Sequence, residues 1–402
     1  MPIDLNWKRR EFLGGAAAVL AGGRAAGAVA GAGAAPAADA PAPAVGPGPG
    51  LIVRESAPEN LESPASAFDS FLTPTPSFYV RSHFAVPRLD AATWRLKVEG
   101  AVRAPVEVSL ADLRGMPATS KVALLECAGN GRVALVPKAK GLLWGPGAVG
   151  TAEWTGVPLR ALLERAGVAP GAVEVVLEGA DSGAVNDEPR SPGVIPFARS
   201  VPLAKALDDV LIAFAMNGRD LTPAHGFPAR AVVPGWYGMA SVKWLRRIVV
   251  TNRPFAGYFQ TLEYATFERA HGLPSLVPLT ENAVKAQVLR PTRGEVVPPG
   301  GAVVVRGLAW AGAATVTRVE VSADDGATWA DARLVGDPVR HAWRAWEWTW
   351  RAPDQAGPHR LLARATDDRG RVQPLARDQD LRNYAISHAI PVEVVVGAPE
   401  RT

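Results

Sequence analysis

The chain of 402 residues contains a single cysteine, Cys127, so an internal disulfide is excluded. It carries little excess charge, and a formal net charge of +4 over this length argues against a nucleic-acid-binding protein. Beyond the N-terminal region it has no long apolar run that would predict a membrane span. It also lacks a Walker loop, a GxGxxG motif, zinc-type Cys/His spacing and internal repeats. These absences, with a hydrophobic content of 48%, indicate a globular protein.

The N-terminus indicates export. A pair of arginines, Arg9 and Arg10, precedes a weakly apolar segment of Ala, Gly, Val and Leu that extends to Gly33. This pattern predicts a twin-arginine signal peptide over residues 1–35, and hence a periplasmic protein that is exported already folded. A transmembrane anchor is the alternative, but the segment is rich in Gly and Ala and is interrupted by Arg24, so it would insert poorly. The twin-arginine route suits a protein whose cofactor must be inserted before export.

Composition divides the rest of the chain. Residues 36–60 are rich in Pro, Ala and Gly and are predicted to form a disordered linker. The residues after this linker are too many for one ordinary core and predict two domains, over residues 61–275 and 276–402. Short strands and short helices mix in the first domain, which indicates an α+β fold. We expect strands at 94–99 and 173–178, helices at 158–166 and 203–207, and an irregular connector at 258–282.

The second domain is rich in β-structure. Its strand-like runs are separated by turn signals, among them Asp-Asp-Gly at residues 324–326. Several such strands over roughly a hundred residues predict an all-β immunoglobulin-like sandwich. Trp346, Trp348 and Trp350 share one face of a strand. They form either an aromatic binding surface or, as we expect, packing in a core or subunit interface. The expected strands are 303–305, 316–321, 344–350 and 359–365.

Cys127 has a sequence context that suits an exposed reactive group. It lies between an apolar run that ends at Glu126 and the turn-forming sequence Gly129-Asn130-Gly131, which predicts a position at the end of a strand, facing a loop. A thiolate is a soft donor for soft metals and redox centres. Considered alone, a buried apolar cysteine is the commoner case.

Several basic residues stand in otherwise apolar stretches. Arg81 and His83 alternate onto one face of a predicted strand, and Arg230 and Lys243 have apolar neighbours. A buried cation without a partner is costly, so these residues indicate a bound anion, such as a phosphate or an oxyanion substrate.

These motifs, taken in order, resemble the sulfite oxidase family of molybdopterin enzymes. The resemblance extends from Tyr79 to about Val395. It implies an α+β sulfite-oxidase-type molybdopterin-binding domain, a molybdenum–molybdopterin cofactor (Moco), and Cys127 as the protein ligand of the metal. The motifs that carry it are residues 78–83 (Phe-Tyr-Val-Arg-Ser-His), 127–130 (Cys-Ala-Gly-Asn), 177–181 (Leu-Glu-Gly-Ala-Asp), 225–230 (His-Gly-Phe-Pro-Ala-Arg), 233–235 (Val-Pro-Gly) and 241–245 (Ser-Val-Lys-Trp-Leu).

The resemblance also implies which residues hold the pterin and its phosphate. The family usually has Asn where this chain has Ser82, so one hydrogen bond to the pterin is expected to be altered or lost. Without the family motifs, Asp181 would be interpreted as a turn residue and His225 as a core histidine. The residues implied in cofactor binding are Tyr79, Arg81, Ser82, His83, Asp181, His225, Arg230, Ser241, Val242 and Lys243.

The substrate pocket is implied to contain four catalytic residues: Arg81, Trp144, Tyr264 and Arg382. Its two arginines would attract and orient a small anion, and the tyrosine hydroxyl would hydrogen-bond to it. The structural alternatives are core packing for Trp144 and Tyr264, and a surface salt bridge for Arg382.

The implied reaction is the molybdenum-dependent oxidation of sulfite to sulfate by oxygen-atom transfer. One cysteine cannot form a haem-binding CxxCH motif, and no cytochrome b5-like segment precedes residue 78. We therefore expect electrons to pass to an external c-type cytochrome. The C-terminal sandwich resembles the family's dimerisation domain, so we expect a homodimer, with no membrane span in the mature chain. The alternatives are a related molybdoenzyme that acts on another sulfur compound (a sulfane or sulfoxide), and an exported, non-enzymatic binding protein.

Overall fold

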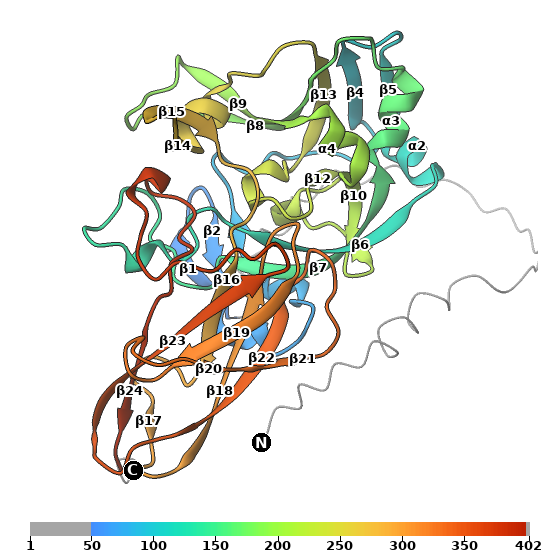
Figure 1. The fold of residues 1–402 in the computed structure, drawn as a ribbon. Coiled ribbons are helices and arrows are strands. Elements are labelled where there is room, and N and C mark those ends of the chain that lie inside the picture. The colour runs from blue at the N-terminus through green and yellow to red at the C-terminus, as the bar shows by residue number, and fades with distance from the viewer. Residues whose placement is uncertain (1–49, 399–402) are drawn as a thin grey trace, which may run out of the picture.

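A computed structural model describes residues 50–398 of the chain. Two parts follow each other along it, one of mixed strands and helices and one of strands (Figure 1, blue to yellow and orange to red). No helix among residues 50–398 is long and apolar enough to cross a membrane. The predicted signal peptide, and the predicted linker as far as residue 49, lie outside the described residues.

One sheet of the first part has the strand order β5-β4-β13-β8-β9. Leu96, Val98 and Ile248 are fully buried in it, because alternate side chains of a strand point to the same face. The register between β8 and β9 shifts between Glu178 and Ser182, next to the buried Asp181. The strands expected at 94–99 and 173–178 are confirmed. The five strands are β4 (Arg95–Gly100), β5 (Val106–Ser109), β8 (Glu174–Ala184), β9 (Val194–Pro202) and β13 (Leu245–Thr251).

A second sheet presents Cys127. Its order is β11-β10-β7-β6, with β12 also paired to β10. β6 and β7 are antiparallel, and their pairing continues to Glu126 opposite Val149. The strand therefore ends directly before Cys127, as the sequence predicts. The strands are β6 (Thr119–Glu126), β7 (Val149–Pro158), β10 (Leu211–Met216), β11 (Arg219–Asp220) and β12 (Arg230–Val232).

A small sheet of β1 (Ile52–Glu55), β2 (Asn60–Glu62) and β3 (Val80–Arg81) corrects two predictions. The linker prediction is wrong for residues 50–60, since β1 pairs with β2 and Asn60 is fully buried. The strand expected to carry both Arg81 and His83 has only two residues, and His83 lies beyond it.

The helices are short and follow local signals. α2 (Leu110–Gly115) begins with a capping box, in which Ser109 and Asp112 each bind the other's backbone N–H. α3 (Leu159–Ala166) buries a face with helical spacing and ends at Gly167, whose φ of 68° favours glycine. With α4 (Leu203–Asp208), it confirms the helices expected at 158–166 and 203–207. The single-turn helices are η1 (Ala65–Phe68), η2 (Thr75–Ser77), η3 (Arg132–Ala134), η4 (Pro223–His225), η5 (Gly238–Ala240), η6 (Phe259–Glu263, a π-helix) and η7 (Gln379–Leu381).

The connector expected to be irregular has a regular structure. After η6 the chain forms the hairpin of β14 (Ala265–Ala270) and β15 (Leu273–Pro278), which pair along their full lengths. Gly272, with a φ of 80°, closes the tight turn between them. The hairpin begins directly after Tyr264, so it fixes one side of that residue.

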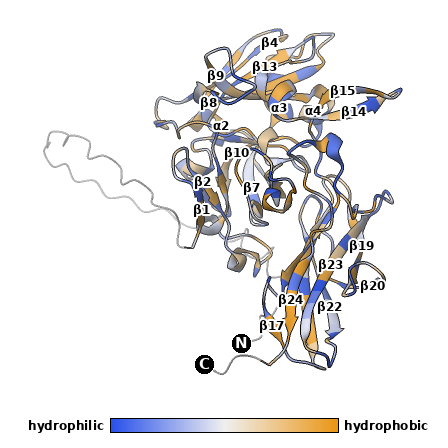
Figure 2. Cartoon of the chain, turned by 90° about the vertical axis from the view of Figure 1, so that its left-hand side faces the viewer, coloured by the Kyte–Doolittle hydropathy of each residue, from blue (hydrophilic) through white to orange (hydrophobic). Residues whose placement is uncertain are grey.

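The second part consists of two sheets, β16-β18-β22-β21 and β17-β24-β23-β19-β20, whose buried residues form one core. Trp346 and Trp350 are buried in this core and Trp348 packs against it, so the tryptophan face is core packing, not a binding surface. The Asp-Asp-Gly turn lies between the antiparallel strands β19 and β20. Figure 2 shows hydrophobic residues along strands of this part such as β24. The expected strands are present, and the bounds are β16 (Lys285–Arg290), β17 (Val296–Val297), β18 (Ala302–Trp310), β19 (Val316–Ser322), β20 (Ala330–Asp331), β21 (Arg333–Val335), β22 (Arg344–Arg351), β23 (Gly357–Asp367) and β24 (Val392–Val396).

Candidate active site

Cys127 is held in a tight turn at the end of β6. Its backbone N–H donates to the carbonyl oxygen of Ala148 (2.9 Å), and its own carbonyl accepts from the N–H of Asn130 (2.8 Å). Burial raises the pKa of the Cys127 thiol, against the opposing charges of Arg81 and Arg132. A buried thiol of raised pKa is a poor nucleophile, whereas a bound metal deprotonates it. The environment of Cys127 therefore suits a metal ligand better than a nucleophile.

Cys127 lines a cavity with about 660 Å³ of empty space, part of it open to solvent. Its lining takes residues from three sheets of the first part, such as Arg81 of β3, Leu125 of β6 and Asp181 of β8. The structure gathers twelve of the residues predicted from the sequence in its lining: Tyr79, Arg81, Ser82, His83, Cys127, Asp181, His225, Arg230, Ser241, Val242, Lys243 and Tyr264.

Asn60, which the sequence analysis missed, orders the segment that carries Arg81. Its side-chain Oδ1 accepts from the backbone N–H of Ser82 (3.0 Å) and from the Arg81 guanidinium (3.2 Å). The same guanidinium donates to the Ser82 carbonyl. Ser82 is buried, and its hydroxyl accepts from the Lys243 ammonium (3.1 Å). Ser82 thus contributes to the cavity by orienting Lys243.

Arg230 and Lys243 form a positively charged end of the cavity. The Arg230 guanidinium donates to the carbonyl oxygens of His225 (3.1 Å) and Ser241 (2.9 Å), and the Lys243 ammonium donates to that of Ala224 (2.9 Å). These contacts are with neutral backbone oxygens, which do not balance two buried positive charges.

The pKa shifts show that this end is suited to an anion. Burial and the charge of Arg230 hold the pKa of Lys243 well below its ordinary value, and burial and Lys243 lower the pKa of His225 to about 3. Burial also raises the pKa of Asp181 to about 6, against the opposing charge of Lys243. Among residues 50–398 the Asp181 Oδ1 is buried and has no hydrogen-bond partner.

The arrangement fits a molybdopterin. Its phosphate would balance Lys243 and Arg230, its amino groups would supply donors to the unpartnered Asp181 oxygen, and its metal would bind the Cys127 sulfur.

Tyr264 and His83 form a polar pair in the same cavity. The Tyr264 hydroxyl lies 2.6 Å from the His83 Nε2, and the His83 ring stacks on Phe197 at 4.5 Å between centroids. Burial raises the pKa of Tyr264 to about 12, although Arg81 opposes this. Burial and Arg81 also hold the pKa of His83 well below its ordinary value. At neutral pH the pair is therefore a phenol hydrogen-bonded to a neutral imidazole.

Two predicted pocket residues lie outside the cavity lining. Trp144 is fully buried and contacts the Tyr79 ring edge-on at 6.5 Å, which is the core packing given as its alternative. Arg382 donates to the carbonyl oxygens of Leu262 and Ala265, both at 3.0 Å, so it supports the backbone on either side of Tyr264. The predicted direct contact of Arg382 with the pocket is thus not seen in this structure.

Arg132 is a buried cation that the sequence analysis did not select. It is 6% exposed and donates to the carbonyl oxygens of Asn383 and Leu142, both at 3.0 Å. Burial raises the pKa of both Cys127 and Tyr264, and the charge of Arg132 opposes this rise at each. Its sequence signal is its place directly after the Gly-Asn-Gly turn. It is the first residue of η3, and its guanidinium lies where a Cβ at Gly129 would stand.

Comparison with known proteins agrees with this geometry. The description "Oxidoreductase molybdopterin binding domain" matches residues 83–259, and "Mo-co oxidoreductase dimerisation domain" matches residues 278–387. Sulfite oxidase of Gallus gallus is 38% identical over an alignment of 345 positions that covers 81% of this chain and 73% of that protein. The chain belongs to the sulfite oxidase family of molybdopterin-dependent oxidoreductases. Its cofactor is molybdenum–molybdopterin, and it is an enzyme, which removes the alternative of a non-enzymatic binding protein.

Two further proteins are similar to this chain over most of its length. Mitochondrial sulfite oxidase of Homo sapiens is 37% identical over 81% of this chain, and the chain spans 61% of that protein's length. The solved structure of the sulfane dehydrogenase SoxCD from Paracoccus pantotrophus is similar, with a TM-score of 0.71, 29% identity and 84% of each chain covered. The fold prediction is thus confirmed for a molybdopterin-binding domain followed by a dimerisation domain, while the immunoglobulin-like class of the latter stays a prediction.

Proposed function

We propose that the enzyme oxidises sulfite to sulfate and passes the electrons to an external acceptor. The observation that carries this proposal is that Cys127, Arg81 and Tyr264 line one cavity. Its support is the similarity to sulfite oxidases over 81% of the chain. The balanced reaction takes one sulfite and one water to one sulfate, two protons and two electrons. When bound, the molybdenum–molybdopterin supplies the oxygen-atom transfer and stores the electron pair.

The chain's own residues bind and orient the anion. Arg81 attracts a sulfite dianion, since its guanidinium is always charged. Tyr264 stays protonated at neutral pH because its pKa is about 12, so its hydroxyl donates a hydrogen bond to a substrate oxygen. The neutral His83, 2.6 Å from that hydroxyl, restricts its orientation. Arg81 and the Tyr264 hydroxyl together therefore favour a small, doubly charged oxyanion.

A related sulfur substrate is the second candidate, since the solved structure with a TM-score of 0.71 is named a sulfane dehydrogenase. Sulfite and a sulfane are both oxidised at a sulfur atom, so the same cofactor chemistry would serve either substrate. A sulfoxide, which the sequence analysis left open, has no net charge and would make less use of Arg81.

The deciding experiment measures the reduction of ferricyanide and of a c-type cytochrome by purified, molybdenum-loaded protein with sulfite or a sulfane donor. In parallel, a sulfoxide is tested as an acceptor of electrons from reduced methyl viologen. Cys127→Ser, loaded to the same molybdopterin content, is the control. Turnover with sulfite that is lost in Cys127→Ser supports the proposal. Turnover with the sulfane alone assigns the second candidate, and no turnover with any of the three from a loaded protein refutes both.

The remaining parts of the proposal concern assembly and location. We propose a homodimer formed through residues 278–387, an immunoglobulin-like sandwich for that domain, and a c-type cytochrome as the physiological acceptor, the first supported by the match to a dimerisation domain. We also propose twin-arginine export to the periplasm, which rests on Arg9 and Arg10. Replacing both by lysine is expected to leave the protein in the cytoplasmic fraction, and unchanged export would refute this point.

A further inference from the structure

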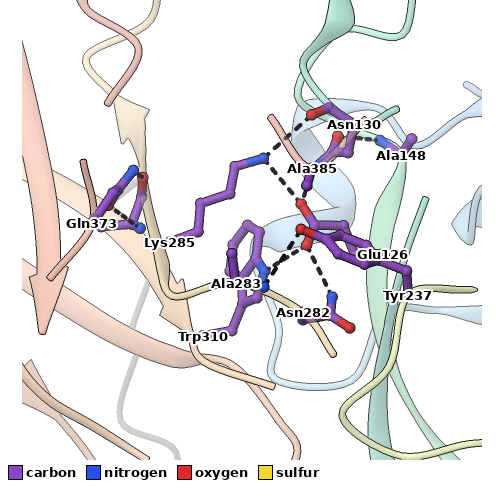
Figure 3. Close-up of polar contacts among 12 residues, drawn as sticks. Glu126, Asn130, Ala148, Tyr237, Asn282, Ala283, Lys285, Trp310, Gln373 and Ala385 are labelled. Carbon is purple, nitrogen blue, oxygen red and sulfur yellow. Dashed lines mark hydrogen bonds and ion pairs between the residues drawn. The ribbon is translucent and has the colours of Figure 1, made fainter. Parts of the chain in front are cut away.

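Glu126, the residue directly before Cys127, is a buried carboxylate with an unusual set of partners. It is 2% exposed, yet both oxygens are satisfied (Figure 3). Oε1 accepts from the Lys285 ammonium (3.0 Å) and the Asn130 amide (3.1 Å). Oε2 accepts from the Asn282 amide (3.0 Å) and the Trp310 indole (2.9 Å). Asn282, Lys285 and Trp310 all belong to the dimerisation domain, so that domain supplies three of the four donors.

The same network reaches the other side of Cys127. Lys285 donates a second hydrogen bond to the carbonyl oxygen of Asn130 (3.3 Å). The Asn130 side chain accepts from the N–H of Ala148 (3.0 Å), whose carbonyl in turn accepts from the N–H of Cys127 (2.9 Å). Lys285 therefore binds the residues on both sides of the Cys127 turn.

The electrostatics make this network rigid. Lys285 is 5% exposed and its ammonium lies over the Trp310 ring at 5.6 Å. Two charges buried this deeply are costly to bring out of water, and removing one of them leaves the other unbalanced in a low-dielectric interior. Both Glu126 oxygens are satisfied, and of the polar side-chain atoms around them only the Asn282 Oδ1 is buried without a partner among the described residues. A buried network with so few free groups favours one arrangement of its members, which specifies position rather than adding much stability.

A second contact fixes the same turn from the same domain. The backbone N–H of Ala385 donates to the carbonyl oxygen of Ala128 (2.8 Å), the residue directly after Cys127. The residues directly before and after the cysteine are thus tied to a domain that has no residue in the lining of the cavity.

We propose that Lys285 is a positioning residue for the metal site: through Glu126 and Asn130, the dimerisation domain fixes the turn that presents Cys127 to molybdenum. The proposal rests on Cys127 as the metal ligand, which is part of the function proposed above. It assigns to this domain a role at the metal centre besides dimerisation. Groups that orient a metal ligand in this way commonly change activity or metal affinity about 10–100-fold when they are removed.

The test uses the full-length holoenzyme with three variants. Lys285→Met removes the cation and leaves Glu126 unbalanced, and the double variant Glu126→Gln/Lys285→Met removes both charges. Arg364→Met is the control, because it also takes a cation from a buried carboxylate of the same domain, Glu320 (2.9 Å), which is not part of the network around Cys127. Glu320 keeps its ion pair with Arg318 (3.1 Å), so this control is the milder change. Each is measured for molybdenum content, melting temperature, the Mo(V) EPR spectrum and the midpoint potential. Reduction is by titanium(III) citrate, so the result does not depend on sulfite being the substrate.

Lys285→Met is expected to bind molybdenum, to give a shifted or heterogeneous Mo(V) signal, and to lose about tenfold or more in kcat. The double variant is expected to recover much of the melting temperature while its spectrum stays altered, since Asn130 still lacks Lys285. Arg364→Met is expected to lower the melting temperature with a wild-type spectrum. A wild-type spectrum and potential in whichever Lys285 variant folds would overturn the proposal and leave the network a purely structural one. If the Lys285 variants have altered spectra and the wild-type holoenzyme does not turn over sulfite, the positioning role of Lys285 stands while sulfite is refuted as the substrate.

Discussion

The strongest quantitative prediction concerns Arg199, a fully buried guanidinium in β9. Its three hydrogen bonds go to backbone carbonyl oxygens: Phe259 (2.5 Å), Leu279 (2.7 Å) and, more weakly, Tyr264 (3.4 Å). These carbonyls belong to η6 and to the residue after the β14–β15 hairpin, the segments on either side of Tyr264. Arg199 therefore holds the backbone that carries the active-site tyrosine.

Two opposing terms set the expected effect of Arg199→Met. The two close hydrogen bonds from a charged donor contribute about 1.5–3 kcal/mol each, so about 3–6 kcal/mol together. Burial lowers the pKa of Arg199 from 12.5 to about 10, which corresponds to a cost of about 3 kcal/mol for burying the charge. Methionine removes both terms. We expect a net loss of about 0–3 kcal/mol, centred on about 1.5 kcal/mol, in the free energy of unfolding, which is smaller than the hydrogen bonds alone would suggest.

The assay is urea unfolding of the cofactor-loaded protein, which gives the free energy of unfolding of the wild type, Arg199→Met and Arg199→Lys. Lysine keeps the buried charge but cannot reach two carbonyls with a planar fork, so Arg199→Lys should be the least stable of the three. Because Tyr264 loses its support, kcat/KM should fall in both variants. If Arg199→Met is more stable than the wild type, or if Arg199→Lys keeps wild-type stability, the balance worked out here is wrong.

Three further changes test other parts of the structure. Gly150→Ala would place a Cβ 2.6 Å from the buried Phe78 ring, and calorimetry should show a loss of about 1–3 kcal/mol; an unchanged melting temperature would mean that the ring moves freely. Asp181→Asn removes a buried carboxylate whose pKa is raised to about 6, so at pH 8 the cofactor-free variant should be at least as stable as the cofactor-free wild type. The variant should also retain less molybdopterin on dialysis. Full retention would contradict a role for Asp181 in binding the cofactor. Burial lowers the pKa of His225 from 6.5 to about 3, so between these pH values the unfolded chain binds one more proton at this residue than the folded chain does. The free energy of unfolding of the cofactor-free protein should therefore fall by up to about 1.4 kcal/mol per pH unit as the pH falls from 6.5 toward 3. Urea midpoints across this range should show a shallower slope in His225→Asn, and equal slopes would argue against a buried neutral histidine.

Much of the site was predictable because its signals are local. A strand followed by Gly-Asn-Gly predicted the position of Cys127, and the structure places it at the end of β6. Basic residues in apolar stretches, such as Arg230 and Lys243, predicted an anion site, because a lone buried cation is costly wherever the chain places it. The two-residue period of a strand likewise predicted a common face for the three tryptophans of β22.

Other features depended on contacts between distant parts of the chain. Arg382 and Trp144 stand in motifs that suggest a pocket, yet one binds backbone carbonyls beside Tyr264 and the other packs under Tyr79. No local pattern shows that Asn60 holds the Arg81 segment, or that Lys285 balances Glu126.

The order of residues thus specifies the kinds of chemistry present: one soft ligand, several cations that need an anion, and a β-rich second domain. Which of these groups meet depends on the folded chain. Side-chain direction and burial depend on the register and packing of strands such as β2, β6 and β16, which are far apart in the chain. The charge of Lys285 is visible in the sequence, but its position beside the Cys127 turn exists only once the two domains have packed together.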